Sequence, residues 1–109
     1  MRYVVVGAGA VGGTVGGRLY DAGRDVVLVA RGEHAEVMRA NGLRLALPDR
    51  VATVRVPVLE SVRETTLGDG DVVLLATKSQ DTLAALADIE IAAAGRAVPV
   101  ACLQNGVAN

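Results

Sequence analysis

The sequence predicts an α/β fold built on a doubly wound, mainly parallel sheet, and three observations support this class. An apolar, β-branched run at residues 3–6 leads directly into a glycine-rich turn. Short apolar runs then alternate with helical segments along the chain. The later runs are apolar throughout, as expected for parallel strands that are covered on both faces.

The first strand, residues 3–6, ends in a turn with the spacing G-x-G-x-x-G. Gly7 permits the tight turn into a helix, Gly9 lets a pyrophosphate approach the backbone, and Gly12 lets the helix press against the sheet. Phosphates would bind at the free N–H groups and positive dipole of that helix. The spacing therefore favours a Rossmann-type dinucleotide site over a tight turn without a ligand. The expected cofactor contacts are Gly7, Ala8, Gly9, Ala10, Val11 and Gly12.

The helix after the turn carries two expected faces. Its core face consists of apolar residues one turn apart, namely Val11, Val15 and Leu19. Gly12 and Gly16 are also one turn apart and would let the helix axis lie close to the sheet. Gly23 then ends the helix as a C-terminal cap.

The middle of the chain predicts a strand at residues 26–30 and a short helix at 33–40, closed by Asn41-Gly42. Between residues 43 and 58 the apolar period changes to two, with a turn at residues 48–50. This pattern predicts an antiparallel hairpin that is either inserted in the sheet or serves as its third strand.

The last third predicts a short helix, two strands and one longer helix. Their ranges are 60–66 for the short helix, 71–77 and 97–103 for the strands, and 81–94 for the helix that Gly95 ends. Asp69 and Asp71 flank Gly70 and are interpreted as turn residues.

Composition excludes several function classes. The 109 residues suit one domain, and 51% of them are hydrophobic, although Phe and Trp are absent. A net charge of −1 and the lack of aromatic platforms argue against nucleic-acid binding and against attraction to an acidic membrane. No apolar run approaches the ~20 residues that span a bilayer. The single cysteine rules out an internal disulfide, and we expect a soluble, cytoplasmic protein.

Polar residues follow three of the predicted strands, where ligands bind in doubly wound sheets. They are Arg31, Lys78 and Asn105. An NAD site requires a carboxylate at the end of the second strand, but Arg31 follows that strand, and a guanidinium suits a 2′-phosphate. We therefore predict NADP over NAD, with an exposed loop arginine as the alternative.

Lys78 is the single lysine of the chain and would project over the cofactor cleft, either contacting a phosphate or ribose or remaining solvated. Asn105 is either a turn residue or a hydrogen-bonding group for a ribose or a substrate carbonyl. Cys102 is interpreted as a small buried side chain and His34 as a non-catalytic residue. No metal-ligand spacing is present.

With these residues assembled, the chain resembles the N-terminal domain of the 2-dehydropantoate 2-reductases (ketopantoate reductases). The resemblance rests on the glycine turn and on four further segments in the family's order: Val29-Ala30-Arg31-Gly32, Asn41-Gly42-Leu43, residues 71–78 and Gln104-Asn105-Gly106-Val107. Together these segments span nearly all of the chain and are far more specific than the glycine turn alone.

The resemblance implies an NADPH-dependent reduction of ketopantoate to pantoate, a step toward pantothenate and coenzyme A. It assigns the pyrophosphate to the glycine turn and the 2′-phosphate to Arg31. Lys78 would contact the cofactor, and Asn105 would contact the nicotinamide ribose and the 2-keto acid substrate. The family's general acid is a lysine of a C-terminal helical domain that is absent from this sequence.

We therefore expect residues 1–109 to form an NADP-binding domain, truncated before the catalytic domain, that contains no catalytic residue and does not turn over ketopantoate. Exposure of the surface meant for the missing domain would favour a homodimer or a domain-swapped form. Two alternatives remain: a non-catalytic dinucleotide-binding sensor module, and the cofactor domain of another NADP-dependent 2-keto acid reductase.

Overall fold

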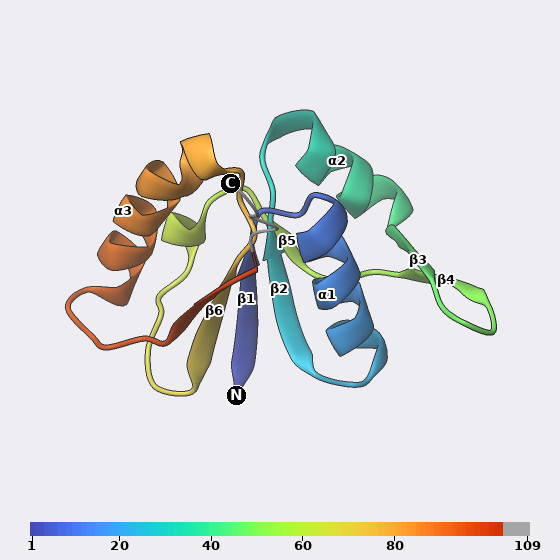
Figure 1. The fold of residues 1–109 in the computed structure, drawn as a ribbon, viewed down its shortest axis with the longest axis horizontal. Coiled ribbons are helices and arrows are strands. Elements are labelled where there is room, and N and C mark those ends of the chain that lie inside the picture. The colour runs from blue at the N-terminus through green and yellow to red at the C-terminus, as the bar shows by residue number, and fades with distance from the viewer. Residues whose placement is uncertain (104–109) are drawn as a thin grey trace.

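Five parallel strands form the centre of the computed structural model, which describes residues 1–103 without the side chain of Ser79 (Figure 1). The strands are β1 (Arg2–Val6), β2 (Asp25–Val29), β5 (Val58–Leu59), β6 (Asp71–Leu75) and β7 (Val100–Cys102). They lie in the order β5-β2-β1-β6-β7, and every neighbouring pair is parallel. The order runs outward from β1 in both directions, which confirms the predicted doubly wound fold.

Helices cover both faces of this sheet. Helices α1 (Ala10–Asp21) and α2 (Gly32–Asn41) lie on one side, and α3 (Thr82–Ala93) lies on the other (Figure 1). Two single-turn 3₁₀ helices, η1 (Val62–Glu64) and η2 (Ser79–Asp81), complete the helical elements of the described residues. Among residues 1–103, no helix combines the length and the apolar character that crossing a bilayer requires.

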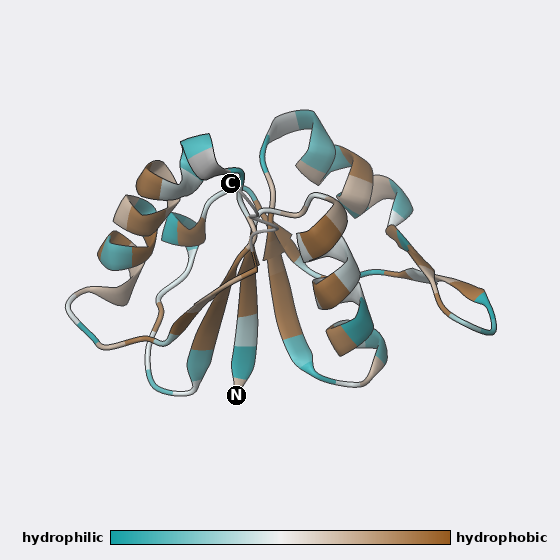
Figure 2. Cartoon of the chain, in the orientation of Figure 1, coloured by the Kyte–Doolittle hydropathy of each residue, from teal (hydrophilic) through white to brown (hydrophobic). Residues whose placement is uncertain are grey.

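The core is divided by the sheet into two layers, because successive side chains of a strand point to opposite faces. Val4 and Val6 of β1 pack with Ile89 of α3, whereas Val5 packs with Leu28 and with Met38 of α2. Figure 2 shows hydrophobic residues along the strands and hydrophilic residues where β1, β2 and β6 begin. Each strand is therefore apolar on both faces, which explains the uninterrupted apolar runs in the sequence.

The buried face of α1 consists of glycine, as the predicted close approach of Gly12 and Gly16 requires, and of the three predicted core residues only Leu19 packs against a core cluster. The buried residues of this helix are Gly12, Gly13, Gly16 and Gly17. Val11 is 39% exposed, and Val15 and Leu19 are only half-buried. A Cβ on Gly16 would overlap the Cδ2 atom of Leu28, so a side chain at this position would force the buried Leu28 side chain to move.

The predicted hairpin is an insertion and not the third strand of the sheet. Strands β3 (Leu43–Ala46) and β4 (Val51–Val54) pair in antiparallel fashion and form a separate two-stranded sheet. This sheet packs against Gly13 and Gly17 of α1, and a Cβ on Gly17 would lie 2.9 Å from Leu43 Cδ2. In chain order, the third strand of the parallel sheet is β5. Its two residues are too few to produce a recognisable apolar pattern in the sequence.

Two further expectations are corrected by the structure. The helix predicted at residues 60–66 is only the 3₁₀ turn η1, which begins with a capping box formed by Ser61 and Glu64. Cys102 is exposed and not buried, because it lies in β7 at an edge of the sheet, where all three strand residues are exposed.

Asp71 is the first residue of β6 and more than a turn residue. Its Oδ1 and Oδ2 atoms each accept a hydrogen bond of 3.1 Å from the Arg2 guanidinium, and Oδ2 accepts another from Gly68 N. Burial raises the pKa of the Asp71 carboxyl, but these hydrogen bonds and the Arg2 charge outweigh burial and hold the pKa below its usual value. The ion pair ties β1 to β6 at the edge where the strands begin.

Alanine substitutions at the neighbouring residues Gly12 and Gly13 should affect stability differently. A Cβ at position 12 would overlap the Gly7 carbonyl oxygen, whereas one at position 13 would meet only ordinary contacts at 3.6 Å. Gly12→Ala should lower the free energy of unfolding by roughly 1–3 kcal/mol through overpacking. Gly13→Ala should leave it unchanged or raise it by up to about 1 kcal/mol, the helix-propensity difference. Urea unfolding measures both, and equal effects of the two variants would contradict the close approach.

Asp71→Asn should destabilise the fold in a pH-dependent way. The pKa of Asp71 is lowered in the folded state, so its stabilisation is complete above the unfolded pKa of about 3.9 and is lost as pH falls through the folded pKa. Unfolding curves between pH 7 and pH 2 should show the difference between the wild type and Asp71→Asn shrinking below about pH 4. The exposed neighbour Asp69, changed to Asn, is the control, and a difference that stays constant with pH would refute the ion-pair account.

Candidate dinucleotide-binding site

The glycine turn lies at the edge of the sheet where the parallel strands end. Gly7 N donates to Val29 O at 3.0 Å, and Ala76 N donates to Val6 O at 2.8 Å, so the turn is held between β2 and β6. Gly7 has a φ of +97°, and a Cβ there would lie 3.0 Å from backbone atoms of Ala76 and Thr77. Glycine is therefore required at position 7 for both conformation and close approach.

Helix α1 begins directly after this turn with unsatisfied backbone donors. Its N-cap residue, Gly9, supplies no side-chain hydrogen bond, and its first turn contains no acidic residue. Apart from its chain neighbours, no described residue lies within 4 Å of the position that a Cβ on Gly9 would occupy. The start of α1 thus combines uncapped N–H groups with open space at Gly9, which fits an anionic group such as a pyrophosphate.

Arg31 is placed by β2 and α2 beside a cavity of about 130 Å³. It is the N-cap residue of α2, it is exposed, and within residues 1–103 its guanidinium makes no hydrogen bond or ion pair. The floor of the cavity is apolar and includes Val6, Val29 and Val62, while Thr77 lies on its wall. The structure therefore brings Arg31 to the ends of the same strands that hold the glycine turn.

The other two predicted site residues are less defined. Lys78 is exposed and follows β6, and its carbonyl oxygen accepts from Asp81 N at 2.9 Å and from Thr82 Oγ1 at 3.2 Å. These bonds fix the backbone from which the lysine side chain projects. Asn105 lies outside the described residues.

The 130 Å³ cavity is also lined by three carboxylate residues that the sequence did not identify as site residues: Glu60, Asp81 and Asp88. Glu60 follows β5 as Arg31 follows β2, but β5 is too short to be recognised without its partner strand. Asp81 and Asp88 lie at the start and in the middle of the predicted last helix, where acidic residues are unremarkable. Within the described residues, no three acidic, histidine or cysteine side chains are grouped to hold a metal ion.

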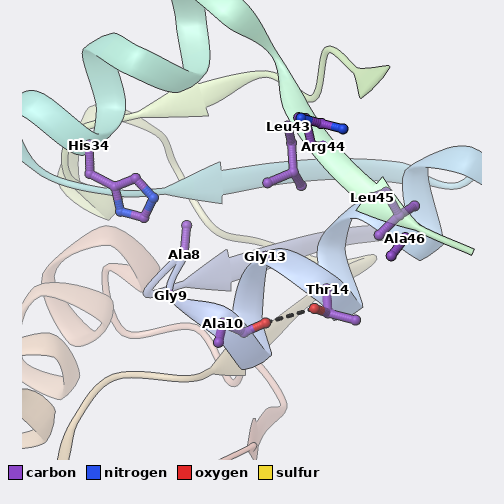
Figure 3. A pocket seen from close by; sticks show the side chains of 10 residues that line it. All are labelled: Ala8, Gly9, Ala10, Gly13, Thr14, His34, Leu43, Arg44, Leu45 and Ala46. Carbon is purple, nitrogen blue, oxygen red and sulfur yellow. Dashed lines mark hydrogen bonds between the residues drawn. The ribbon is translucent and has the colours of Figure 1, made fainter. Parts of the chain in front are cut away.

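A second cavity, of about 440 Å³, lies on the other side of the glycine turn (Figure 3). The turn, α1 and the β3–β4 hairpin form its walls, with Leu43 and Leu45 contributing apolar surface. Thr14 Oγ1 donates to Ala10 O at 2.7 Å and is thereby satisfied within α1. His34 lies on the rim near Ala8, a position that the sequence did not indicate.

Comparisons with known proteins agree with this geometry. Residues 3–109 match the family model described as ketopantoate reductase PanE/ApbA. A 2-dehydropantoate 2-reductase of Mesorhizobium japonicum is 40% identical over 108 residues, which are 98% of this chain and 32% of the relative.

Solved structures give the same result. A PanE/ApbA family ketopantoate reductase of Ralstonia eutropha is 37% identical with a TM-score of 0.83, over 98% of this chain and 35% of that one. D-mandelate dehydrogenase, solved with NADH and anilino(oxo)acetate, is 26% identical with a TM-score of 0.81, over 99% of this chain and 35% of that one. The chain thus spans about a third of the length of these relatives. It belongs to the ketopantoate reductase PanE/ApbA family.

Proposed function

We propose that residues 1–109 form the NADPH-binding domain of an oxidoreductase that reduces 2-dehydropantoate to pantoate, in the synthesis of pantothenate and coenzyme A. The observation that carries the cofactor assignment is Arg31, which follows β2 and lines the cavity beside the glycine turn. A guanidinium at this position, with no partner among residues 1–103, suits a 2′-phosphate. The substrate assignment is taken from the relatives named 2-dehydropantoate 2-reductase.

The chain's own residues bind and orient the cofactor in this proposal. The first N–H groups of α1 hold the pyrophosphate, Gly9 leaves the space that it occupies, and Arg31 holds the 2′-phosphate. Lys78 contacts the cofactor, and Asn105 binds the nicotinamide ribose and the 2-keto acid. NADPH, when bound, supplies the hydride that reduces the ketone carbon.

A second candidate is the cofactor domain of a reductase for another 2-keto acid. The likeness to D-mandelate dehydrogenase, which was solved with NADH, favours this alternative and also favours NADH as cofactor. The non-catalytic sensor module, the other alternative that the sequence left open, has no comparable support.

The location and assembly of the protein are also proposals. We place it in the cytoplasm, where a lone exposed cysteine such as Cys102 stays reduced. A homodimer is consistent with the apolar surface of α3, where Leu83 is 81% exposed and Ile91 is 56% exposed.

Arg31→Ala should weaken NADPH binding at least about tenfold, which corresponds to ~1.4 kcal/mol, and should leave NADH binding nearly unchanged. The reason is that only NADPH carries the 2′-phosphate that the guanidinium would pair with. Fluorescence titration with each cofactor measures both dissociation constants. Arg24→Ala is the matched control, because Arg24 is also exposed and lies at the opposite end of β2.

Equal losses of NADPH and NADH affinity in Arg31→Ala, or an equal effect of Arg24→Ala, would overturn the 2′-phosphate assignment. Tighter binding of NADH than of NADPH by the wild type would favour the second candidate.

Residues 1–109 expressed alone should bind NADPH without reducing 2-dehydropantoate. Among the described residues only Lys78 is suited to protonate the substrate oxygen, and the proposal assigns it to the cofactor. Loss of NADPH absorbance at 340 nm, followed with and without 2-dehydropantoate, provides the assay. Turnover that co-purifies with the chain and is abolished by Lys78→Ala would refute this assignment.

A further inference from the structure

The wall of the 130 Å³ cavity carries more negative than positive charge. Among the described residues that line it, Arg31 is the only cation, whereas Glu60, Asp81 and Asp88 are all carboxylates. A 2′-phosphate adds about two further negative charges to such a site. Arg31 alone therefore does not explain a preference for a phosphorylated ribose, and the charge of the carboxylates beside it becomes important.

Glu60 is the cavity carboxylate that follows the strand paired with β2. Strand β5 pairs with β2 so that Leu59 lies opposite Val29, and Ala30 N donates to Leu59 O at 2.9 Å. Glu60 is the first residue after β5 and Arg31 is the second after β2, so both lie at the edge of the sheet where these adjacent strands end. Both residues line the cavity.

Arg39 of α2 holds the Glu60 carboxylate. Its Nη1 atom lies 3.3 Å from Glu60 Oε2, and its Nη2 atom donates to Val58 O at 3.0 Å. The second bond anchors the Arg39 guanidinium on the backbone of β5 and so holds the cationic partner of the ion pair in place. The nearby Glu64 carboxylate is already occupied, because its Oε2 atom accepts from the backbone N–H groups of Glu60 and Ser61.

We propose that Glu60 is a specificity-determining residue that opposes the 2′-phosphate, and that Arg39 is a positioning residue that offsets its charge. Cofactor preference is then set by Arg31, Glu60 and Arg39 together. This inference rests on the proposed binding of NADPH beside Arg31. The ion pair between Arg39 of α2 and Glu60, which follows β5, tunes this preference without contacting the nicotinamide end of the cofactor.

The test compares dissociation constants for NADPH and NADH in Glu60→Gln, Arg39→Gln and the double variant, at low salt. Glu60→Gln should tighten NADPH binding about two- to fivefold, and Arg39→Gln should weaken it by a similar factor, the range expected for an exposed ion pair. NADH binding should change in neither variant. The double variant should resemble Glu60→Gln, because Arg39 has no charge left to offset at position 60.

Two controls separate this electrostatic role from a structural one. Asp21→Asn and Arg50→Gln break another exposed ion pair, of 3.1 Å, between the end of α1 and the β3–β4 turn, and should leave both dissociation constants unchanged. Arg39→Lys keeps the charge and should restore most of the NADPH preference if Arg39→Gln lowers it. The effects on NADPH should also shrink at high ionic strength.

The inference is overturned if Glu60→Gln and Arg39→Gln shift NADPH binding in the same direction, leave it unchanged, or shift NADPH and NADH equally. It is also overturned if the effect of Arg39→Gln persists in the double variant. A failure of the proposed function gives a different result, since Arg31→Ala would then show no selective loss of NADPH. Selective loss in Arg31→Ala with no response to Glu60→Gln refutes this inference alone.

Discussion

The close approach of α1 to the sheet is the constraint on which the rest of the structure depends. One glycine row of this helix, Gly12 and Gly16, faces the Gly7 carbonyl and the side chain of Leu28. A second row, Gly13 and Gly17, faces the leucines of the hairpin. The helix is therefore held between two sheets with no side chain as a spacer. Each helical glycine disfavours the helix by roughly 1 kcal/mol relative to Ala, and close packing on both sides offsets this loss.

This approach also positions the candidate site. Because Gly12 lies against Gly7, the first turn of α1 sits directly over the end of β1, with its N–H groups at the edge of the sheet. The same edge receives Arg31 from β2, Lys78 from β6 and Glu60 from β5. The opposite edge carries the Arg2–Asp71 ion pair, which fastens the two central strands where they begin. One end of the sheet thus supports the fold, and the other presents the polar groups.

Much of this arrangement was predictable from local sequence patterns. The glycine spacing, the apolar runs and the residue after each long strand were enough to predict the doubly wound sheet, the antiparallel hairpin and the placement of Arg31. Apolar periodicity wrongly predicted that Val11 is a core residue. The buried face of α1 is formed by glycines, which have no side chain and therefore do not contribute to an apolar pattern. Cys102 lies in an apolar run and is nevertheless exposed, since the position of β7 at the sheet edge depends on strand order. Glu60 was not predicted as a site residue for a similar reason. It follows a strand of two residues, which can be identified only from its pairing with β2.

In the proposed function, the glycine turn and Arg31 together hold the phosphates of NADPH. Titration of the ¹⁵N-labelled chain with NADPH, followed by two-dimensional NMR, locates the bound phosphates residue by residue. We expect saturable shifts of the amides of Gly9, Ala10 and Arg31, with the Arg31 response absent when NADH replaces NADPH. Shifts confined to the β3–β4 hairpin or to α3, or identical responses of Arg31 to the two cofactors, would contradict it.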